Sequence, residues 1–231
     1  MKLNTPLTRG TLVERYKRFF GDVRLDDGSI VTAHCANSGS MMNVKEPGSP
    51  VWLSANQNPK AKLDWRWEMI EVDGSLVGIN TMHPNRIVEE AILDNNIKEL
   101  TGYAEVRREV KYGKENSRID LLLEGPGRCY VEVKNVTLKR ENHAEFPDAV
   151  TTRGAKHLRE LLEMVKEGHR AVMVYLVQRA DCDYFTVAGD IDPEYEKGLK
   201  AAMAGGVEVL CYQCQLSEEE ITLDKPLRIS L

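Results

Sequence analysis

Short apolar segments with a period of two fill the first eighty residues of the chain. Six such segments lie between residues 8 and 80, and none has the length or the spacing of a helix. The dipeptides Asp27-Gly28 and Asp73-Gly74 favour tight hairpin turns between neighbouring segments. Several short strands joined by turns are typical of a small β-barrel or sandwich, and we expect a five-stranded OB-fold barrel.

The periodicity changes to that of a helix after residue 81. Pro84 occupies the first position of a predicted helix that extends to Leu100, because proline is tolerated at that position. Four apolar residues form the buried stripe of this helix, namely Ile87, Val88, Ala91 and Ile92. The change predicts a boundary between a first domain at 1–81 and a second domain at 82–231.

Strand and helix patterns alternate through the second domain. The run AVMVYLVQR at 171–179 is almost continuously apolar, which indicates a buried central strand. One helix is expected to begin at Thr151 or Thr152, and another at Asp192-Pro193. Residues 136–147 are expected to form a loop. The predicted fold class is α/β (α+β overall), with strands and helices alternating after the barrel.

The stretch SRIDLLLEGPGRCYVEVKN, at 117–135, predicts a hairpin that carries the candidate chemistry. Gly125-Pro126-Gly127 is a turn, and this three-residue loop pairs residues whose numbers sum to 252. Asp120 then faces Glu132, and both lie on one side of the sheet with Arg118 and Lys134. The other side collects the apolar residues Ile119, Leu121, Leu123, Val131 and Val133.

Two carboxylates that converge beside a lysine suit a hard divalent cation. Mg²⁺ prefers oxygen ligands and commonly takes one or two carboxylates, with water and phosphate at its other positions. Lys134 reaches the same space, where an ammonium steadies an attacking water or a phosphoryl oxygen. A cross-strand ladder of salt bridges is the alternative interpretation of the same residues.

Composition and charge narrow the function classes. The net charge of −5 argues against a protein coated in nucleic acid but allows a local basic groove. No apolar run has the length of a membrane span and the first residues lack a signal core, so we expect no membrane partner. Five cysteines without a disulfide-like framework indicate a reducing compartment, and hence cytoplasmic localisation.

Cations and aromatic residues suited to nucleic acid occur in several places. The barrel supplies two groups, and the helix that begins near Thr151 supplies another at its N-terminal turns, where free N–H groups favour phosphate. Phe19 and Phe20 are assigned to the core instead. The candidate nucleic-acid contacts are Arg15, Lys17, Arg18, Lys62, Trp65, Arg66, Arg118, Arg153, Lys156 and His157.

Two levels of resemblance follow from these residues. Asp120 followed by Glu132-Val133-Lys134 resembles the D…(D/E)xK signature of the PD-(D/E)xK nucleases. Longer stretches resemble the sugar fermentation stimulation protein family, SfsA, along nearly the whole chain. These stretches are LVERYKRFF at 12–20, NSGSM at 37–41, PNRIVEEAI at 84–92, EVKYG at 109–113, SRID at 117–120, YVEVKNVTL at 130–138 and FPDAVTTRGAKHLREL at 146–161.

The resemblance implies an N-terminal OB-fold barrel that binds nucleic acid, followed by a PD-(D/E)xK, restriction-endonuclease-like domain whose mixed sheet is flanked by helices. Many nucleases of this kind supply a glutamate from the first helix to the metal. Periodicity does not separate Glu89 from Glu90, but the family motif falls on Glu90, with Glu89 as its exposed neighbour. The expected metal ligands are thus Glu90, Asp120 and Glu132, which with Lys134 form the catalytic set. The expected cofactor is Mg²⁺, with Mn²⁺ as a substitute.

Two functions of different classes fit these expectations. The first is a Mg²⁺-dependent nuclease that binds DNA without sequence specificity, since the chain contains no recognition-helix motif. The second is a non-catalytic DNA-binding regulator, because the family description implies non-specific DNA binding and a link to maltose metabolism. RNA remains open as the nucleic acid in either case, and the sequence does not determine the oligomeric state.

Overall fold

The computed structural model describes residues 1–4, 6–114 and 117–231. It begins with a six-stranded sheet whose order is β3-β2-β1-β4-β5-β6, and an additional pairing of β3 with β5 closes its first five strands into a barrel. The predicted OB-fold barrel is therefore confirmed. Its strands are β1 (Thr8–Tyr16), β2 (Phe20–Leu25), β3 (Ile30–His34), β4 (Pro50–Ala55), β5 (Trp65–Val72) and β6 (Ser75–Gly78).

Turn and packing chemistry explain the closure of the barrel. The turns at Asp27-Gly28 and Asp73-Gly74 form as predicted, and both glycines adopt the positive φ angles that these turns require. Inside the barrel, the indole of Trp67 is fully buried. A Cβ atom on Gly21 would lie 3.0 Å from that indole, so the glycine makes room for the largest side chain of the barrel core.

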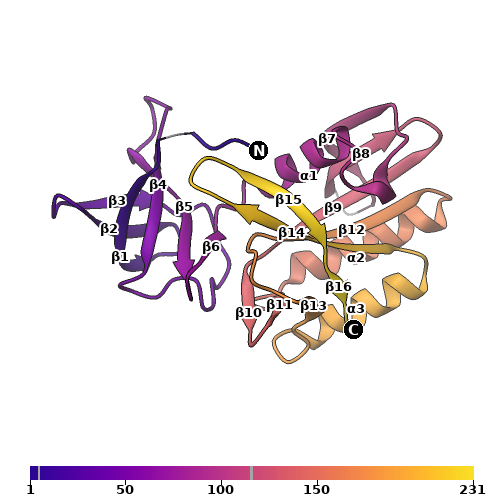
Figure 1. The fold of residues 1–231 in the computed structure, drawn as a ribbon. Coiled ribbons are helices and arrows are strands. Elements are labelled where there is room, and N and C mark those ends of the chain that lie inside the picture. Colours follow the sequence, from indigo (N-terminus) through magenta and orange to yellow (C-terminus); the bar gives the residue numbers. More distant parts are fainter. Residues whose placement is uncertain (5, 115–116) are drawn as a thin grey trace.

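A mixed six-stranded sheet of order β15-β14-β12-β9-β8-β7 forms the centre of the second domain (Figure 1). The predicted central strand at 171–179 is β12 (Arg170–Val177), parallel to both of its neighbours. Those neighbours are β9 (Arg128–Val136) and β14 (Glu208–Leu216). The outer strands are β7 (Glu105–Tyr112), β8 (Ser117–Glu124) and β15 (Ile221–Pro226).

Helices cover both faces of this sheet. The helix α1 (Pro84–Leu93) contributes to one apolar core cluster, whereas α2 (Thr152–Lys166) and α3 (Pro193–Ala204) contribute to the cluster on the opposite face. Both later helices start at predicted caps, because Thr151 accepts a hydrogen bond from Gly154 N and Asp192 accepts one from Tyr195 N. Cys211 and Cys214 lie in different core clusters, as expected for residues on opposite faces of a strand.

Two predictions about local structure were wrong. The first helix ends at Leu93 instead of Leu100, because Asn95 adopts a left-handed φ of 58° before the short helix η1 (Lys98–Leu100). The expected loop at 136–147 contains two strands, which alternation over so few residues did not reveal. They belong to a small sheet made of β10 (Leu138–Arg140), β11 (His143–Phe146), β13 (Tyr184–Val187) and β16 (Arg228–Ile229).

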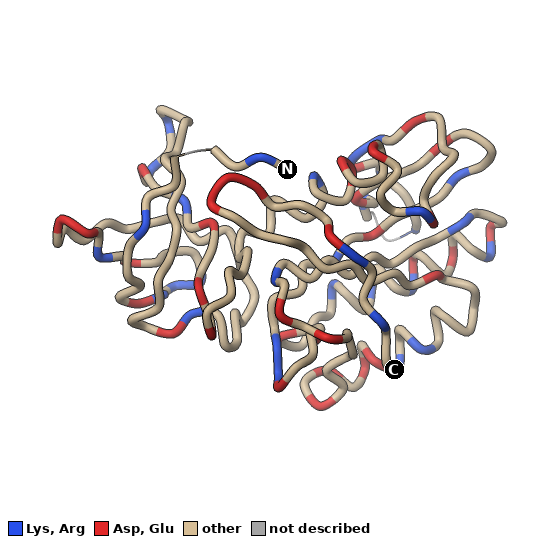
Figure 2. Tube along the Cα trace, in the orientation of Figure 1, with Lys and Arg blue, Asp and Glu red and all other residues tan. Residues whose placement is uncertain are grey.

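The first residues of the chain lie on the second domain, although the sequence assigned them to a domain at 1–81. The amino group of Met1 donates to Ile221 O at 2.8 Å, and Leu3 N donates to Glu219 O at 2.8 Å. Figure 1 shows the N-terminus close to the β14–β15 hairpin, whose tip is acidic in Figure 2. A further link joins the domains where Gly78 N donates to Gln178 O.

Among the described residues, no helix combines the length and the apolar character needed to cross a membrane.

Candidate functional site

The β8–β9 hairpin has the predicted register up to the point where its two strands separate. Leu121 pairs with Val131 and Leu123 pairs with Cys129, so the residue numbers sum to 252. Beyond Leu121, Asp120 Oδ2 accepts a hydrogen bond from Val133 N at 2.8 Å. A side chain therefore occupies the place of a backbone partner, and the hairpin opens at its acidic residues.

This opening divides the apolar face that the sequence predicted. Leu121, Leu123, Val131 and Val133 belong to the core cluster of α1, as alternation requires. Ile119 belongs instead to the cluster of α2 and α3, so its predicted place beside Leu121 was wrong. Strict alternation fails here because β8 still pairs with β7 at Ile119 but no longer pairs with β9.

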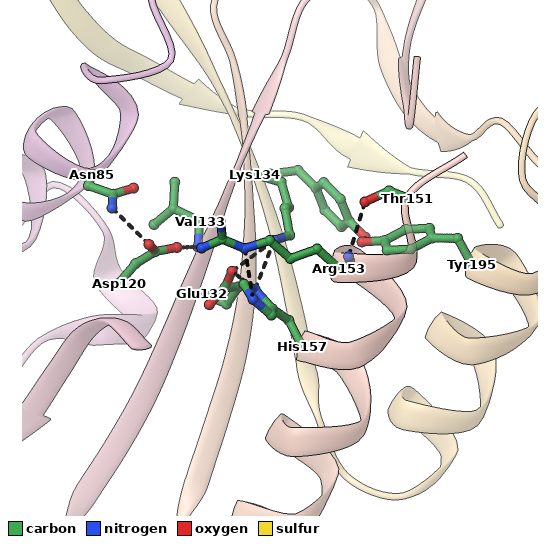
Figure 3. A network of polar contacts seen from close by, with 11 residues as sticks. Asn85, Asp120, Glu132, Val133, Lys134, Thr151, Arg153, His157 and Tyr195 are labelled. Carbon is green, nitrogen blue, oxygen red and sulfur yellow. Dashed lines mark hydrogen bonds and ion pairs between the residues drawn. The ribbon is translucent and has the colours of Figure 1, made fainter. Parts of the chain in front are cut away.

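Asp120 is half-buried at the mouth of the hairpin, and two donors hold its carboxylate. Asn85 Nδ2, from the first turn of α1, donates to Oδ1 at 2.8 Å, and Val133 N donates to Oδ2 (Figure 3). Burial raises the pKa of Asp120 to about 6, and the negative charge of Glu132 adds to this shift. A cation beside the two carboxylates would relieve their repulsion.

Glu132 is only 2% exposed, and its two oxygens have different surroundings. Lys134 Nζ donates to Oε1 at 2.7 Å, and His157 Nδ1 contacts the same oxygen. Burial opposes ionisation of this carboxyl, but Lys134 and His157 outweigh that effect and hold its pKa below the usual value. The second oxygen, Oε2, is buried and has no hydrogen-bond partner among the described residues.

The helix α2 brings His157 and Arg153 to the same place. Its N-cap at Thr151 fixes the first turn, and Arg153 Nε lies 3.3 Å from His157 Nε2 (Figure 3). His157 is buried against Glu132, so it supports the carboxylate and does not form the exposed phosphate contact that the sequence predicted. Arg153 remains exposed at the cleft, whereas Lys156 is not among the described residues that line it.

These side chains line a cleft of about 340 Å³ that both domains build. Asn37, Ser38 and Gly39 of the barrel form one wall, and the opened hairpin and the start of α2 form others. The barrel loop is tied across the boundary because Met41 N donates to Asp148 Oδ2 at 2.8 Å. The first domain is therefore part of the cleft itself.

Arg15, predicted as a nucleic-acid contact, supports this loop instead. Its Nη2 donates to the carbonyl oxygens of Arg18, Asn37 and Gly39 at 2.9, 2.8 and 3.0 Å. Three backbone acceptors around one nitrogen hold the guanidinium in place, so its role is to shape the wall of the cleft.

Glu90 is not brought to Asp120 and Glu132. Its carboxylate lies 2.9 Å from the Met1 amino group and 2.8 Å from Arg86 Nε. Glu89, expected to be the exposed neighbour, is the less exposed of the two, at 17% against 36%, and contacts Arg108. The expectation that Glu89 is the exposed neighbour was therefore wrong. Each glutamate contacts a charged group from another segment of the chain, and the period of the helix does not reveal such contacts.

The remaining predicted contacts are distributed over the barrel and the hairpin. Lys17 and Arg18 form the exposed β1–β2 turn, and Arg118 is exposed on β8. Lys62 and Arg66 line a hollow on the outside of the barrel, while Trp65 packs against the barrel core and is not among the described residues that line this hollow. Phe19 was wrongly assigned to the core, because it is 45% exposed beside Lys62 and Arg66 at that hollow.

Sequence reasoning missed two residues of the site. Asn85 is adjacent to Pro84 in a segment whose only clear signal was helical, and its contact with Asp120 spans 35 residues. Asp148 joins the barrel loop from a distance of 107 residues. Nothing in the local pattern around either residue indicates its partner, although both lie within the stretches that carry the family resemblance.

The donor set fits a hard divalent cation that completes its shell with water or phosphate oxygens. No group of three or more histidine, cysteine, aspartate or glutamate side chains suited to a metal occurs within the described ranges. Asp120 and Glu132 do converge, however, and the orphaned Oε2 of Glu132 is a buried acceptor that a cation would satisfy.

Comparisons with known proteins give one consistent result. The model of the SfsA N-terminal OB domain matches residues 13–79, and the model of the sugar fermentation stimulation protein RE domain matches residues 82–220. A sugar fermentation stimulation protein homolog of Rhodospirillum centenum is 60% identical over all of both chains. A homolog of Paramagnetospirillum magneticum is 59% identical over 100% of this chain and 98% of its own.

A solved structure also matches. The structure of SfsA from Pyrococcus furiosus in complex with Ca²⁺ aligns with a TM-score of 0.91 and 27% sequence identity. The match covers 100% of this chain and 98% of that one.

Proposed function

Because this chain belongs to the sugar fermentation stimulation protein (SfsA) family, we propose that it binds DNA without sequence specificity and hydrolyses phosphodiester bonds in its cleft with Mg²⁺. Mn²⁺ substitutes for Mg²⁺ in this proposal. The observation that carries it is that Glu132 lines the cleft together with Asp120, and that its buried Oε2 has no hydrogen-bond partner among the described residues. A buried carboxylate oxygen without a donor costs free energy, and a divalent cation offsets that cost.

Asp120 and Glu132 would hold the cation. Bound there, the metal would lower the pKa of a water molecule and neutralise charge on the phosphate. The Ca²⁺ in the name of the Pyrococcus furiosus structure supports this assignment, because Ca²⁺ also prefers oxygen ligands.

The other residues of the cleft position these two carboxylates. Asn85 and the backbone N–H of Val133 fix the orientation of Asp120. Lys134 and His157 both contact Oε1 of Glu132, which leaves Oε2 as the oxygen available to a cation. Lys134 is 13% exposed, so its ammonium group also reaches the solvent of the cleft, where it would stabilise charge on a phosphoryl oxygen.

A nucleic-acid backbone would enter along the basic side of the cleft. Arg153 is exposed at the first turn of α2, where helix geometry and charge both favour phosphate. Ser38 and Gly39 of the barrel form the facing wall. Contacts of this kind carry no sequence information, which agrees with binding that lacks specificity.

The test compares wild type with Glu132→Gln, and uses Glu124→Gln at the other end of the same hairpin as the matched control. Calorimetric titration of Mg²⁺ and Mn²⁺ should show binding to wild type and to the control only. Wild type and Glu124→Gln, but not Glu132→Gln, should cleave DNA, which is tested with single-stranded, duplex and branched substrates. Equal metal binding by all three proteins, or cutting that survives in Glu132→Gln, would exclude this centre.

A DNA-binding regulator without catalysis is the second candidate, and the ion pairs of the site favour it. Lys134 lies 2.7 Å from Glu132 Oε1 and 3.2 Å from His157 Nδ1, so the network already balances much of the buried charge without a metal. The names of the relatives refer to stimulation of sugar fermentation. DNA binding without metal binding or cutting in the experiment above would establish this function instead.

A further inference from the structure

A second hollow lies on the outside of the barrel, and we call it the barrel pocket. It has a volume of about 410 Å³, and its lining includes Phe19, Phe20, His34, Lys62, Arg66 and Met82. Strand register places three of these side by side, because Phe20 pairs with His34 and His34 pairs with Arg66. The pocket thus spans β2, β3 and β5, between the β1–β2 turn and the β4–β5 loop.

Aromatic and apolar groups form much of this lining. Phe20 stacks on Tyr16 with ring centroids 5.5 Å apart and an interplanar angle of 22°, which holds its ring in place. Phe19 is 45% exposed and Met82 is 71% exposed. Exposed apolar side chains at the edge of a hollow that also holds a fixed aromatic ring provide a surface suited to a flat, partly apolar ligand.

The charge at the pocket is positive and unbalanced. Within the part of the chain that the structure describes, neither Lys62 nor Arg66 makes an ion pair or a side-chain hydrogen bond, and no acidic residue lines the pocket. Lys62 is exposed and Arg66 is half-buried, whereas the half-buried cations Lys139 and Arg170 are paired with Asp181 and Glu208. An aromatic surface beside two unpaired cations complements a ligand that combines a ring with an anion.

The barrel pocket adjoins the cleft that contains Asp120 and Glu132. Thr81 lines the cleft, whereas Met82 lines the barrel pocket. The same division occurs at Ala36, which lines the pocket, and Asn37, which lines the cleft. Consecutive Cα atoms are 3.8 Å apart, so at both positions the cleft and the barrel pocket are lined by adjacent residues of the same chain segment.

We propose that the barrel pocket binds an unpaired nucleobase of a single-stranded nucleic acid whose backbone continues into the cleft. Stacking on an aromatic side chain requires an exposed base face, which a duplex does not offer, and every base has such a face. Lys62 and Arg66 then contact the phosphates next to the stacked base. The inference rests on the proposed function, because it takes the substrate of the cleft to be a nucleic acid. It adds that this substrate has a single-stranded segment.

Fluorescence anisotropy in EDTA measures this binding without cleavage. The probes are labelled dT12, rU12 and a duplex of mixed sequence, each titrated with the full chain. Phe19→Ala should weaken binding of the single strands by roughly 5- to 150-fold, the range that base stacking on an aromatic ring represents. Arg66→Gln should weaken the same probes and reduce the salt dependence of binding, while both variants change duplex affinity by less than about twofold.

Matched controls lie elsewhere on the barrel. Ile30→Ala removes an exposed apolar side chain from β3, and Arg24→Gln removes an exposed cation from β2; neither residue lines the barrel pocket. A dT12 probe with 5-iodouracil should form its photo-crosslink on the peptide that contains Phe19. Binding by Phe19→Ala and Arg66→Gln equal to that of the controls would overturn the proposal.

Failure of this inference is distinguishable from failure of the proposed function. Cutting that depends on Glu132, together with single-strand binding unchanged by Phe19→Ala, would keep the metal centre and exclude the base pocket. Loss of single-strand binding in Phe19→Ala, in a protein that neither binds metal nor cuts, would keep the pocket and exclude the nuclease. Loss of binding in Phe19→Ala for only one of the two probes, dT12 or rU12, supports the pocket and identifies whether it binds DNA or RNA.

Discussion

The amide nitrogen of Asn85 lies 2.8 Å from Oδ1 of Asp120, and this contact connects the first turn of α1 to the point where the hairpin opens. The helix thereby fixes the orientation of the carboxylate proposed to hold a cation. Asn85→Ala should lower metal affinity by about 10- to 100-fold, as loss of a residue that orients a ligand commonly does. Calorimetry gives the affinity, and circular dichroism shows whether the fold is retained.

Asn96→Ala is the control for this prediction, because Asn96 is exposed beyond the end of α1 and lies outside the cleft. Unchanged affinity in Asn85→Ala would mean that Val133 N alone suffices to orient Asp120.

The close approach of Gly21 to Trp67 gives a stability prediction for the barrel. In Gly21→Ala the new Cβ would lie 3.0 Å from the indole, which is fully buried and has little room to move. Overpacking of this kind costs about 1–3 kcal/mol. Urea unfolding should show this loss. In contrast, Gly127→Ala, whose new Cβ meets no atom of the described residues within 4 Å, should change stability by less than about 0.5 kcal/mol.

The Arg179–Asp181 pair predicts a pH dependence of stability. Burial opposes ionisation of Asp181, but hydrogen bonds from Arg179 at 2.6 and 2.8 Å and from Lys139 prevail and lower its pKa to about 2. Because this pKa lies below the unfolded value near 3.8, the pair stabilises the folded state above about pH 4. The contribution disappears as the pH falls towards 2.

Asp181→Asn tests this dependence. At pH 7 it should lower the free energy of unfolding by about 1–3 kcal/mol, since Arg179 is 1% exposed and would lose its charged partner. The difference from wild type should shrink when unfolding is measured between pH 4 and pH 2.5. Asp26→Asn, at an exposed turn, should show no such trend, and a difference for Asp181→Asn that is constant with pH would contradict the assignment.

The sequence was most informative where local pattern and fold agree. The turn at Gly125-Pro126-Gly127 and the apolar residues on either side of it sufficed to predict the register of the hairpin, which is confirmed as far as Leu121. β12 was equally clear, because a central parallel strand is buried on both faces and therefore reads as one apolar run.

The remaining features depend on contacts between distant segments. The strands of the small sheet, β10 and β11, have three and four residues, too few for an alternation to be visible. The contact of Met41 N with Asp148 and that of Asn85 with Asp120 follow from the packing of whole elements. Phe19 was placed in the core on hydrophobicity alone, whereas its position in the β1–β2 turn leaves it exposed.

Glu90 provides the sharpest contrast between the sequence prediction and the geometry. The family resemblance implies Glu90 as a metal ligand, while the structure pairs it with Arg86 and the amino group of Met1. We expect Glu90→Gln to keep metal affinity within about twofold of wild type and to lower stability by about 1 kcal/mol, because the lost ion pair with Met1 is partly buried. Calorimetric titration of Mg²⁺ and urea unfolding measure the two effects separately. Glu89→Gln in parallel shows whether the other edge of α1 contributes, and a loss of affinity in Glu90→Gln as large as that in Glu132→Gln would mean that the helix turns this carboxylate into the cleft when a cation binds.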